Sequence, residues 1–204
     1  MWEYFSQGGP VMWPLLLASV LTISLSFDRF YHLWRARGDG RGLMDRVREA
    51  MQSGDSQAAV DICRKGHGPA AAMLCAGLKA VRGGDKAFER AVAETGNREL
   101  FRLERHLDTL SFVANAAPLL GLLGTVMGLI RIFNVFARQA SPDTMALAGG
   151  IGEVLTATAT GLMIAVVATV AHHFFSRQVD EIMAEAENLT YDLAGTAGLR
   201  DHAA

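Results

Sequence analysis

Two ionisable residues interrupt long apolar runs of this sequence, and such residues are its first candidates for chemistry. Arg131 is the only Lys, Arg, Asp or Glu between Phe112 and Phe136, and Glu153 is the only one in the run 149–175. A charge inside a membrane segment is costly in free energy and often marks an ion or proton path. The two residues therefore predict either a conduction path or an ion pair with each other at the membrane surface.

Threonine hydroxyls accompany both charged positions. Glu153, Thr156 and Thr160 share one face of a helix, whereas Thr158 points about 140° away from Glu153. Thr125 is expected at a similar depth in the preceding run. A band of hydroxyls at one depth suits a water-accessible path or a polar partner. The side chains predicted to line a proton path are Thr125, Thr158, Glu153, Thr156 and Thr160.

Small residues form a stripe along the first of these runs. Pro118, Gly121, Thr125 and Gly128 follow one another at steps of three and four, and Gly124 with Gly128 makes a GxxxG pattern. Small residues allow two helices to approach closely in a membrane. Close packing is therefore a competing explanation for the stripe. It is expected at Pro118, Gly121, Gly124, Gly128 and Gly161.

These residues need membrane-spanning helices to position them, and the sequence predicts three. The first, 11–27, is 17 residues long, at the short end for a span. A cleaved signal peptide is disfavoured, because no Lys or Arg precedes the run and Asp28-Arg29-Phe30 follows it. The other spans are predicted at 111–136 and 149–175, and they form a helical hairpin. Aromatic residues at the outer end of the first span suggest an interfacial belt: Trp2, Tyr4, Phe5 and Trp13.

The distribution of charge predicts how the chain crosses the membrane. Of the 19 Lys and Arg residues, 15 lie between Asp28 and Leu110, and basic loops stay in the cytoplasm. We therefore expect a periplasmic N-terminus and a cytoplasmic C-terminus. The predicted segments are a periplasmic interfacial segment (1–10), span one (11–27), a cytoplasmic helical domain (28–110), span two (111–136), a periplasmic turn (137–148), span three (149–175) and a cytoplasmic helical tail (176–204).

The cytoplasmic domain is predicted to consist of short helices. Asp55 is expected to cap a helix that runs to Arg64, and Pro69 to open the next helix. A break is predicted at Gly96-Asn97, followed by one continuous helix over 98–136. The third span is expected to continue into the tail without interruption, as far as residue 193. The sequence thus predicts an all-α membrane protein.

Several function classes find no support in the composition. No basic run is interleaved with aromatic residues, so nucleic acid is not an expected partner. Cys63 and Cys75 have neither the CxxC nor a zinc spacing, and we expect both to be reduced structural residues. No nucleophile–base arrangement or phosphate-binding glycine loop is present. We therefore predict no enzyme activity, no cofactor and no metal site.

Two stretches resemble the signatures of the ExbB/TolQ/MotA proton-channel family. Residues 117–129 (APLLGLLGTVMGL) are similar to its second-span signature, and residues 151–162 (IGEVLTATATGL) to its third-span signature. Asp28-Arg29-Phe30 after span one also fits. The number of spans and the length favour the ExbB branch, with TolQ next, over MotA. Val167 stands where the family often has proline, and His172-His173 where it often has Tyr-Asn.

The resemblance implies a homopentamer in the bacterial inner membrane whose second and third spans enclose a pore. Inside it would sit a single-span partner like ExbD or TolR, which carries the titrating Asp, and a protein like TonB is a possible further partner. Thr125, Thr158 and Glu153 match the family's pore-lining positions. The implied function is conversion of the proton-motive force into mechanical work for TonB-dependent outer-membrane transport. A TolQ-like role in envelope maintenance and a non-conducting membrane scaffold remain as alternatives.

Overall fold

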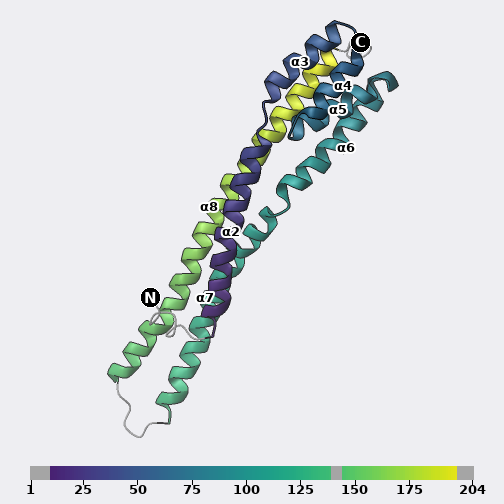
Figure 1. Ribbon diagram of the computed structural model, residues 1–204. Helices are drawn as coiled ribbons and strands as arrows, with labels where there is room; N and C mark the ends of the chain where they lie inside the picture. The colour runs from purple at the N-terminus through teal and green to yellow at the C-terminus, as the bar shows by residue number, and fades with distance from the viewer. Residues whose placement is uncertain (1–9, 139–143, 197–204) are drawn as a thin grey trace. The chain divides into compact units, whose positions relative to one another are not determined.

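A computed structural model describes residues 10–138 and 144–196, and all the secondary-structure elements assigned within these residues are helices (Figure 1). The all-α prediction is therefore confirmed for these residues. In chain order the elements are α2 (Met12–Ala36), α3 (Gly40–Gln52), α4 (Ser56–Lys65), α5 (Pro69–Ala80), the short 3-10 helix η1 (Val81–Gly83), α6 (Asp85–Glu104), α7 (Leu107–Phe136) and α8 (Thr144–Thr196).

The chain divides into two compact units, and α2 and α8 contribute to both. The hairpin unit comprises residues 1–28 and 106–174, and the helical-domain unit comprises residues 29–105 and 175–204. Within the described residues, two helical segments are long and apolar enough to cross a membrane: Leu107–Phe136, which contains an 18-residue stretch with a mean hydropathy of 1.9, and Ala148–Gly195, which contains one with 2.0. α2 does not meet that standard, since charged residues follow its apolar run. The three-span layout therefore stays a prediction.

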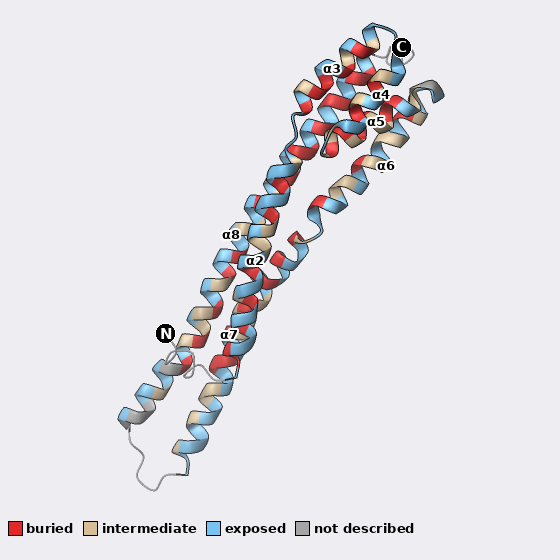
Figure 2. Cartoon of the chain, viewed as in Figure 1, coloured by how far each residue is buried: buried red, intermediate tan, exposed pale blue. Residues whose placement is uncertain are grey.

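α7 is too exposed for a core helix of a soluble protein. In its most apolar window only 11% of the residues are buried, and Figure 2 shows long exposed stretches along the helix. Leu119, Leu122 and Ile130 are all more than half exposed. Such a surface belongs in lipid or against other membrane helices.

One face of α2 is covered within the hairpin unit. Leu15, Ala18 and Thr22 recur at steps of three and four and are each at most 8% exposed. Leu15 and Ala18 belong to apolar clusters that also contain buried alanines of α7 and α8: Ala117, Ala157, Ala165 and Ala168. This face of α2 therefore packs against α7 and α8 within the hairpin unit. The opposite face, with Leu17 and Val20, is exposed.

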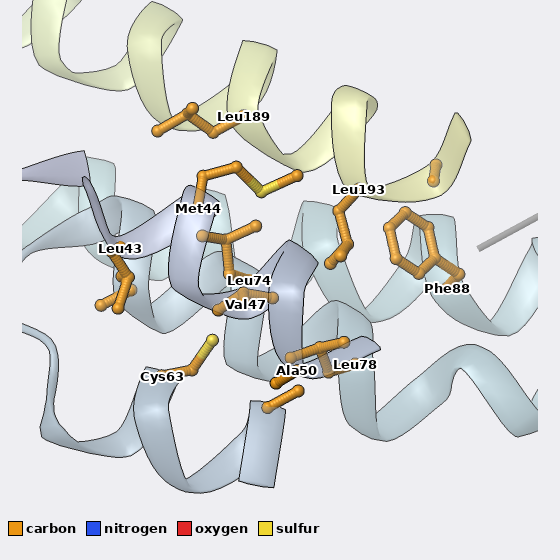
Figure 3. Packing of buried hydrophobic residues seen from close by; sticks show 13 residues of the cluster. Leu43, Met44, Val47, Ala50, Cys63, Leu74, Leu78, Phe88, Leu189 and Leu193 are labelled. Atoms are coloured by element: carbon orange, nitrogen blue, oxygen red, sulfur yellow. The ribbon is translucent and has the colours of Figure 1, made fainter. Parts of the chain in front are cut away.

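The helical-domain unit has an apolar core of its own, to which α3, α4, α5, α6 and the end of α8 contribute (Figure 3). Val47, Leu74 and Leu193 are fully buried there. The predicted helix starts are confirmed: Asp55 accepts a hydrogen bond from the Ala58 backbone N–H at 2.9 Å, and Pro69 is the first residue of α5. Local capping signals thus set these boundaries.

Two predicted helix boundaries near residue 100 were wrong. α6 runs unbroken through Gly96. The glycine there serves close packing and not a helix break, because an added Cβ would be 3.3 Å from the Met73 methyl carbon. The expected continuous helix over 98–136 instead ends at Glu104, and α7 begins at Leu107.

A buried arginine of α2, Arg29, contacts the C-terminal end of α6. Arg29 is 5% exposed, and its Nη1 donates to the Leu103 carbonyl at 3.2 Å. In a continuous helix that carbonyl would accept from the backbone four residues later. The guanidinium therefore supplies a donor to a carbonyl at the helix terminus.

α8 confirms the uninterrupted third helix and extends it at both ends. It begins at Thr144, inside the segment predicted as a periplasmic turn, and continues to Thr196. Residues 139–143 of that predicted turn lie outside the described residues, as do most of the predicted interfacial segment 1–10 and the aromatic residues Trp2, Tyr4 and Phe5.

Candidate functional site

The backbones of α7 and α8 touch where two glycines meet. A Cβ added to Gly161 would lie 2.6 Å from the Ala117 carbonyl oxygen and 3.0 Å from the Gly121 Cα. A Cβ added to Gly121 would lie 3.0 Å from the Thr158 Cα. Any larger residue here would force the two backbones apart, so the sequence uses glycine on both helices.

The same helix pair stays close along the rest of the glycine stripe. A Cβ on Gly124 would be 2.9 Å from the Ala157 Cβ, and one on Gly128 would overlap the side chain of Val154. Further along, Gly150 of α8 packs against Ile132. The contacts define an antiparallel hairpin.

Pro118 sits inside α7 and is partly buried. Because proline has no backbone N–H, the carbonyl four residues earlier loses its helical donor at this point.

Thr158 links the two helices through its hydroxyl. Its Oγ1 donates to the Gly121 carbonyl oxygen at 3.0 Å. Thr125 lies one turn beyond Gly121 on α7, is 9% exposed, and donates within its own helix to Leu122 at 2.7 Å. A hydroxyl group that donates one hydrogen bond still has lone pairs that can accept another hydrogen bond. Both side chains can therefore accept a hydrogen bond from water or from a protonated carboxyl group.

The remaining predicted threonines lie on α8 and form a local contact. Thr160 donates its hydroxyl to the Thr156 carbonyl at 2.8 Å, and both residues are partly buried. The structure thus brings Thr158 to the glycine crossing and leaves Thr156 and Thr160 on another face of the same helix.

The two charged candidates lie at one level of the hairpin. Gly150 packs on Ile132 and Gly128 faces Val154, so positions 131 and 153 fall between these two contacts. Arg131 is exposed. The side chain of Glu153 lies outside the described residues, so its place on a proton path and its ion pair with Arg131 both stay predictions.

The structure adds a pair that the sequence reasoning did not single out. In the hairpin unit, His106 Nδ1 lies 3.4 Å from Asp28 Oδ2, an ion-pair distance without hydrogen-bond geometry. His106 immediately precedes α7, and Asp28 directly follows the apolar run of α2. The position of Asp28 in the Asp28-Arg29-Phe30 motif was a signal in the sequence, but its partner is 78 residues away.

Comparison with known proteins identifies the family. The MotA/TolQ/ExbB proton channel family matches residues 65–188, which include α7 and the apolar part of α8. The chain belongs to this family. The resemblance seen in the sequence is thereby confirmed: the protein is a membrane protein of a proton-channel family, and that family is not an enzyme class.

Individual relatives carry ExbB and TolQ names. The ExbB-like 1 protein of Synechocystis sp. is 33% identical over 92% of this chain and 76% of its own length. The biopolymer transport protein exbB1 of Vibrio cholerae is 29% identical over 97% of this chain and 89% of its own length. The Tol-Pal system protein TolQ of Haemophilus influenzae is 36% identical over 48% of this chain and 42% of its own length.

Proposed function

We propose that this chain is an ExbB-like subunit of an inner-membrane motor that uses the proton-motive force to energise TonB-dependent transport across an outer membrane. Similarity to the ExbB proteins of Synechocystis sp. and Vibrio cholerae extends over more than 90% of the chain, whereas similarity to the TolQ protein of Haemophilus influenzae covers 48% of it. Family membership and the Thr158–Gly121 contact at the glycine crossing are the observations that support a proton-conducting core.

In this proposal α7 and α8 of five subunits surround a single-span partner of the ExbD or TolR type. Much of the apolar surface of α7 is exposed in the isolated chain, which leaves area for neighbouring subunits and for lipid. The partner would carry the titrating Asp, and a TonB-like protein would receive the mechanical work. The proposed topology keeps the three spans at 11–27, 111–136 and 149–175, with the N-terminus in the periplasm.

Thr125 and Thr158 are the proposed proton-path residues of this chain. Their hydroxyls already donate to backbone carbonyls, so they would act on the path as acceptors. Acceptor oxygens at this depth would solvate the protonated form of the partner's Asp and the water that delivers its proton. Thr156 and Thr160 are proposed as further pore-facing hydroxyls.

Valine and serine substitutions test this assignment. Thr125→Val and Thr158→Val remove the hydroxyl at nearly constant volume, and we expect both to reduce TonB-dependent uptake in cells. The serine variants keep the hydroxyl and should keep most of the activity. Thr109→Val, on the exposed face of α7, is the matched control.

Pentamer assembly should be unchanged in all of these variants, as measured by cross-linking or native mass spectrometry. Full uptake by both valine variants would refute the role of the two hydroxyls.

Glu153 is proposed to act through its charge. Glu153→Asp keeps a carboxylate, whereas Glu153→Gln keeps the size and loses the charge. We expect the Gln variant to reduce uptake more than the Asp variant, and equal activities would favour a purely structural role.

A TolQ-like function is the second candidate, because a TolQ protein is among the relatives. Complementation separates the two. An ExbB-like chain restores TonB-dependent uptake in a strain that lacks ExbB and TolQ, whereas a TolQ-like chain restores resistance to detergent instead. The single-span partner must be expressed together with the chain and must come from the same organism.

A further inference from the structure

A hollow at the end of α7 combines positive charge with apolar surface. It has a volume of about 310 Å³ and is lined by Met127, Ile130, Arg131, Asn134, Val135 and Arg138. Arg131, Asn134 and Arg138 follow one another at steps of three and four, so they share one face of the helix. Ile130 and Val135 beside them are both more than half exposed.

The hollow lies at the surface of the membrane whichever way the chain is inserted. Arg131 is 20 residues beyond the start of the proposed second span at residue 111, or about 30 Å at 1.5 Å per residue, which is roughly the thickness of the hydrocarbon core. Arg138 follows the last residue of α7 by two positions. The apolar side chains of the hollow thus reach the edge of the hydrocarbon, and its arginines reach the headgroup level.

The charge of the hollow is unbalanced within the described residues. None of its lining residues is acidic, and neither Arg131 nor Arg138 has an ion pair there. The negative end of the α7 dipole offers only a partial counter-charge. Arginine binds phosphate with two parallel hydrogen bonds, and the Asn134 amide adds a further donor.

We propose that this hollow binds the headgroup of an anionic phospholipid, such as phosphatidylglycerol, in the leaflet at the C-terminal end of α7. The phosphate lies between Arg131 and Arg138, and an acyl chain runs along Met127 and Ile130. The site lies beyond Thr125 and Thr158, the two proposed proton-path threonines, and does not depend on them.

Lipid retention by the purified full-length protein tests the site. The protein is equilibrated with micelles that contain equal amounts of phosphatidylglycerol and phosphatidylcholine, and native mass spectrometry measures the ratio of the two bound lipids. We expect the wild type to retain phosphatidylglycerol in excess. The double variant Arg131→Gln/Arg138→Gln should lower this preference by up to about 25-fold, or ~2 kcal/mol at about 1 kcal/mol for each arginine.

Two further variants keep the test decisive. Arg138→Gln alone changes a residue outside the apolar helix and should lower the preference about fivefold even where the double variant fails to fold. Arg90→Gln removes the same charge from α6, where Arg90 pairs with Glu94, and should change nothing. Equal retention of the two lipids by the wild type, as expected if Glu153 neutralises Arg131, would overturn the proposal. A preference unchanged in Arg138→Gln would overturn it too.

Discussion

Gly161 provides a direct test of the contact between α7 and α8. In Gly161→Ala the new methyl group would lie 2.6 Å from the Ala117 carbonyl oxygen and 3.0 Å from the Gly121 Cα. Both obstacles are backbone atoms, so no side-chain rotation relieves the clash and the helices must separate. Gly152→Ala is the matched control, because it lies in the same helix and its Cβ would meet nothing within 4 Å.

The expected loss of stability follows from these distances. Overpacking of a tight contact costs about 1–3 kcal/mol. Separation of the helices also lengthens the 3.0 Å hydrogen bond from Thr158 to Gly121, which is worth about 0.6 kcal/mol in a membrane protein. The gain in helix propensity from Gly to Ala, up to about 1 kcal/mol, is common to both variants and cancels. Gly161→Ala should therefore be less stable than Gly152→Ala by about 1.5–3.5 kcal/mol.

Thermal unfolding of the purified protein in detergent measures this difference. At about 2–4 °C per kcal/mol for a chain of this size, the two midpoints should differ by roughly 3–14 °C. Equal midpoints would show that α7 and α8 do not meet at Gly161 and Gly121, and the hairpin described above would be wrong.

Three further outcomes are expected outside this contact. Arg29→Met should destabilise the protein by about 1.5–3 kcal/mol in denaturant unfolding, because the Leu103 carbonyl loses a charged donor; no loss would show that the buried charge is not needed. Cys63 should resist alkylation at pH 8 while Cys75 reacts, since burial and, secondarily, Cys75 raise the pKa of the Cys63 thiol to about 12. Because the folded state holds this proton more tightly than the unfolded state, raising the pH from about 9 to 12 should favour unfolding in the wild type and less so in Cys63→Ala.

The parts of the fold that the sequence predicts well depend on neighbouring residues. α4 and α5 start where expected because the Asp55 cap and Pro69 act within one helical turn. The long α8 was also predictable, since no proline or pair of glycines interrupts it after Gly150.

Contacts between distant residues account for what the sequence did not reveal. A glycine signals either a helix break or a close contact, and Gly96 is a close contact only because Met73 of another helix lies against it. The end of α6 involves Arg29, which is 74 residues from Leu103 in the chain. Such long-range partners leave no periodic pattern.

In the candidate site, too, local signals were predictable and contacts between distant residues were not. Its glycine and threonine positions are visible as a helical stripe, but the partner of each residue depends on the register between α7 and α8. That register, which sets Thr158 against Gly121, comes from backbone contact and not from any local signal. The hollow at the end of α7 was not predicted, because the sequence pattern paired Arg131 with Glu153 of the facing span and not with Arg138 just beyond the end of its own helix.

Proton flux through the reconstituted complex tests the central claim most directly. The protein and its single-span partner are placed in vesicles that enclose a pH-sensitive dye, and a potential is applied. We expect flux through the wild-type complex and a decrease of about tenfold or more in Thr125→Val and Thr158→Val, because a hydrogen bond to an ionising group is worth about 1.5–3 kcal/mol. Absence of flux in the wild-type complex would favour a non-conducting scaffold, and undiminished flux in both variants would contradict the proton path proposed for α7 and α8.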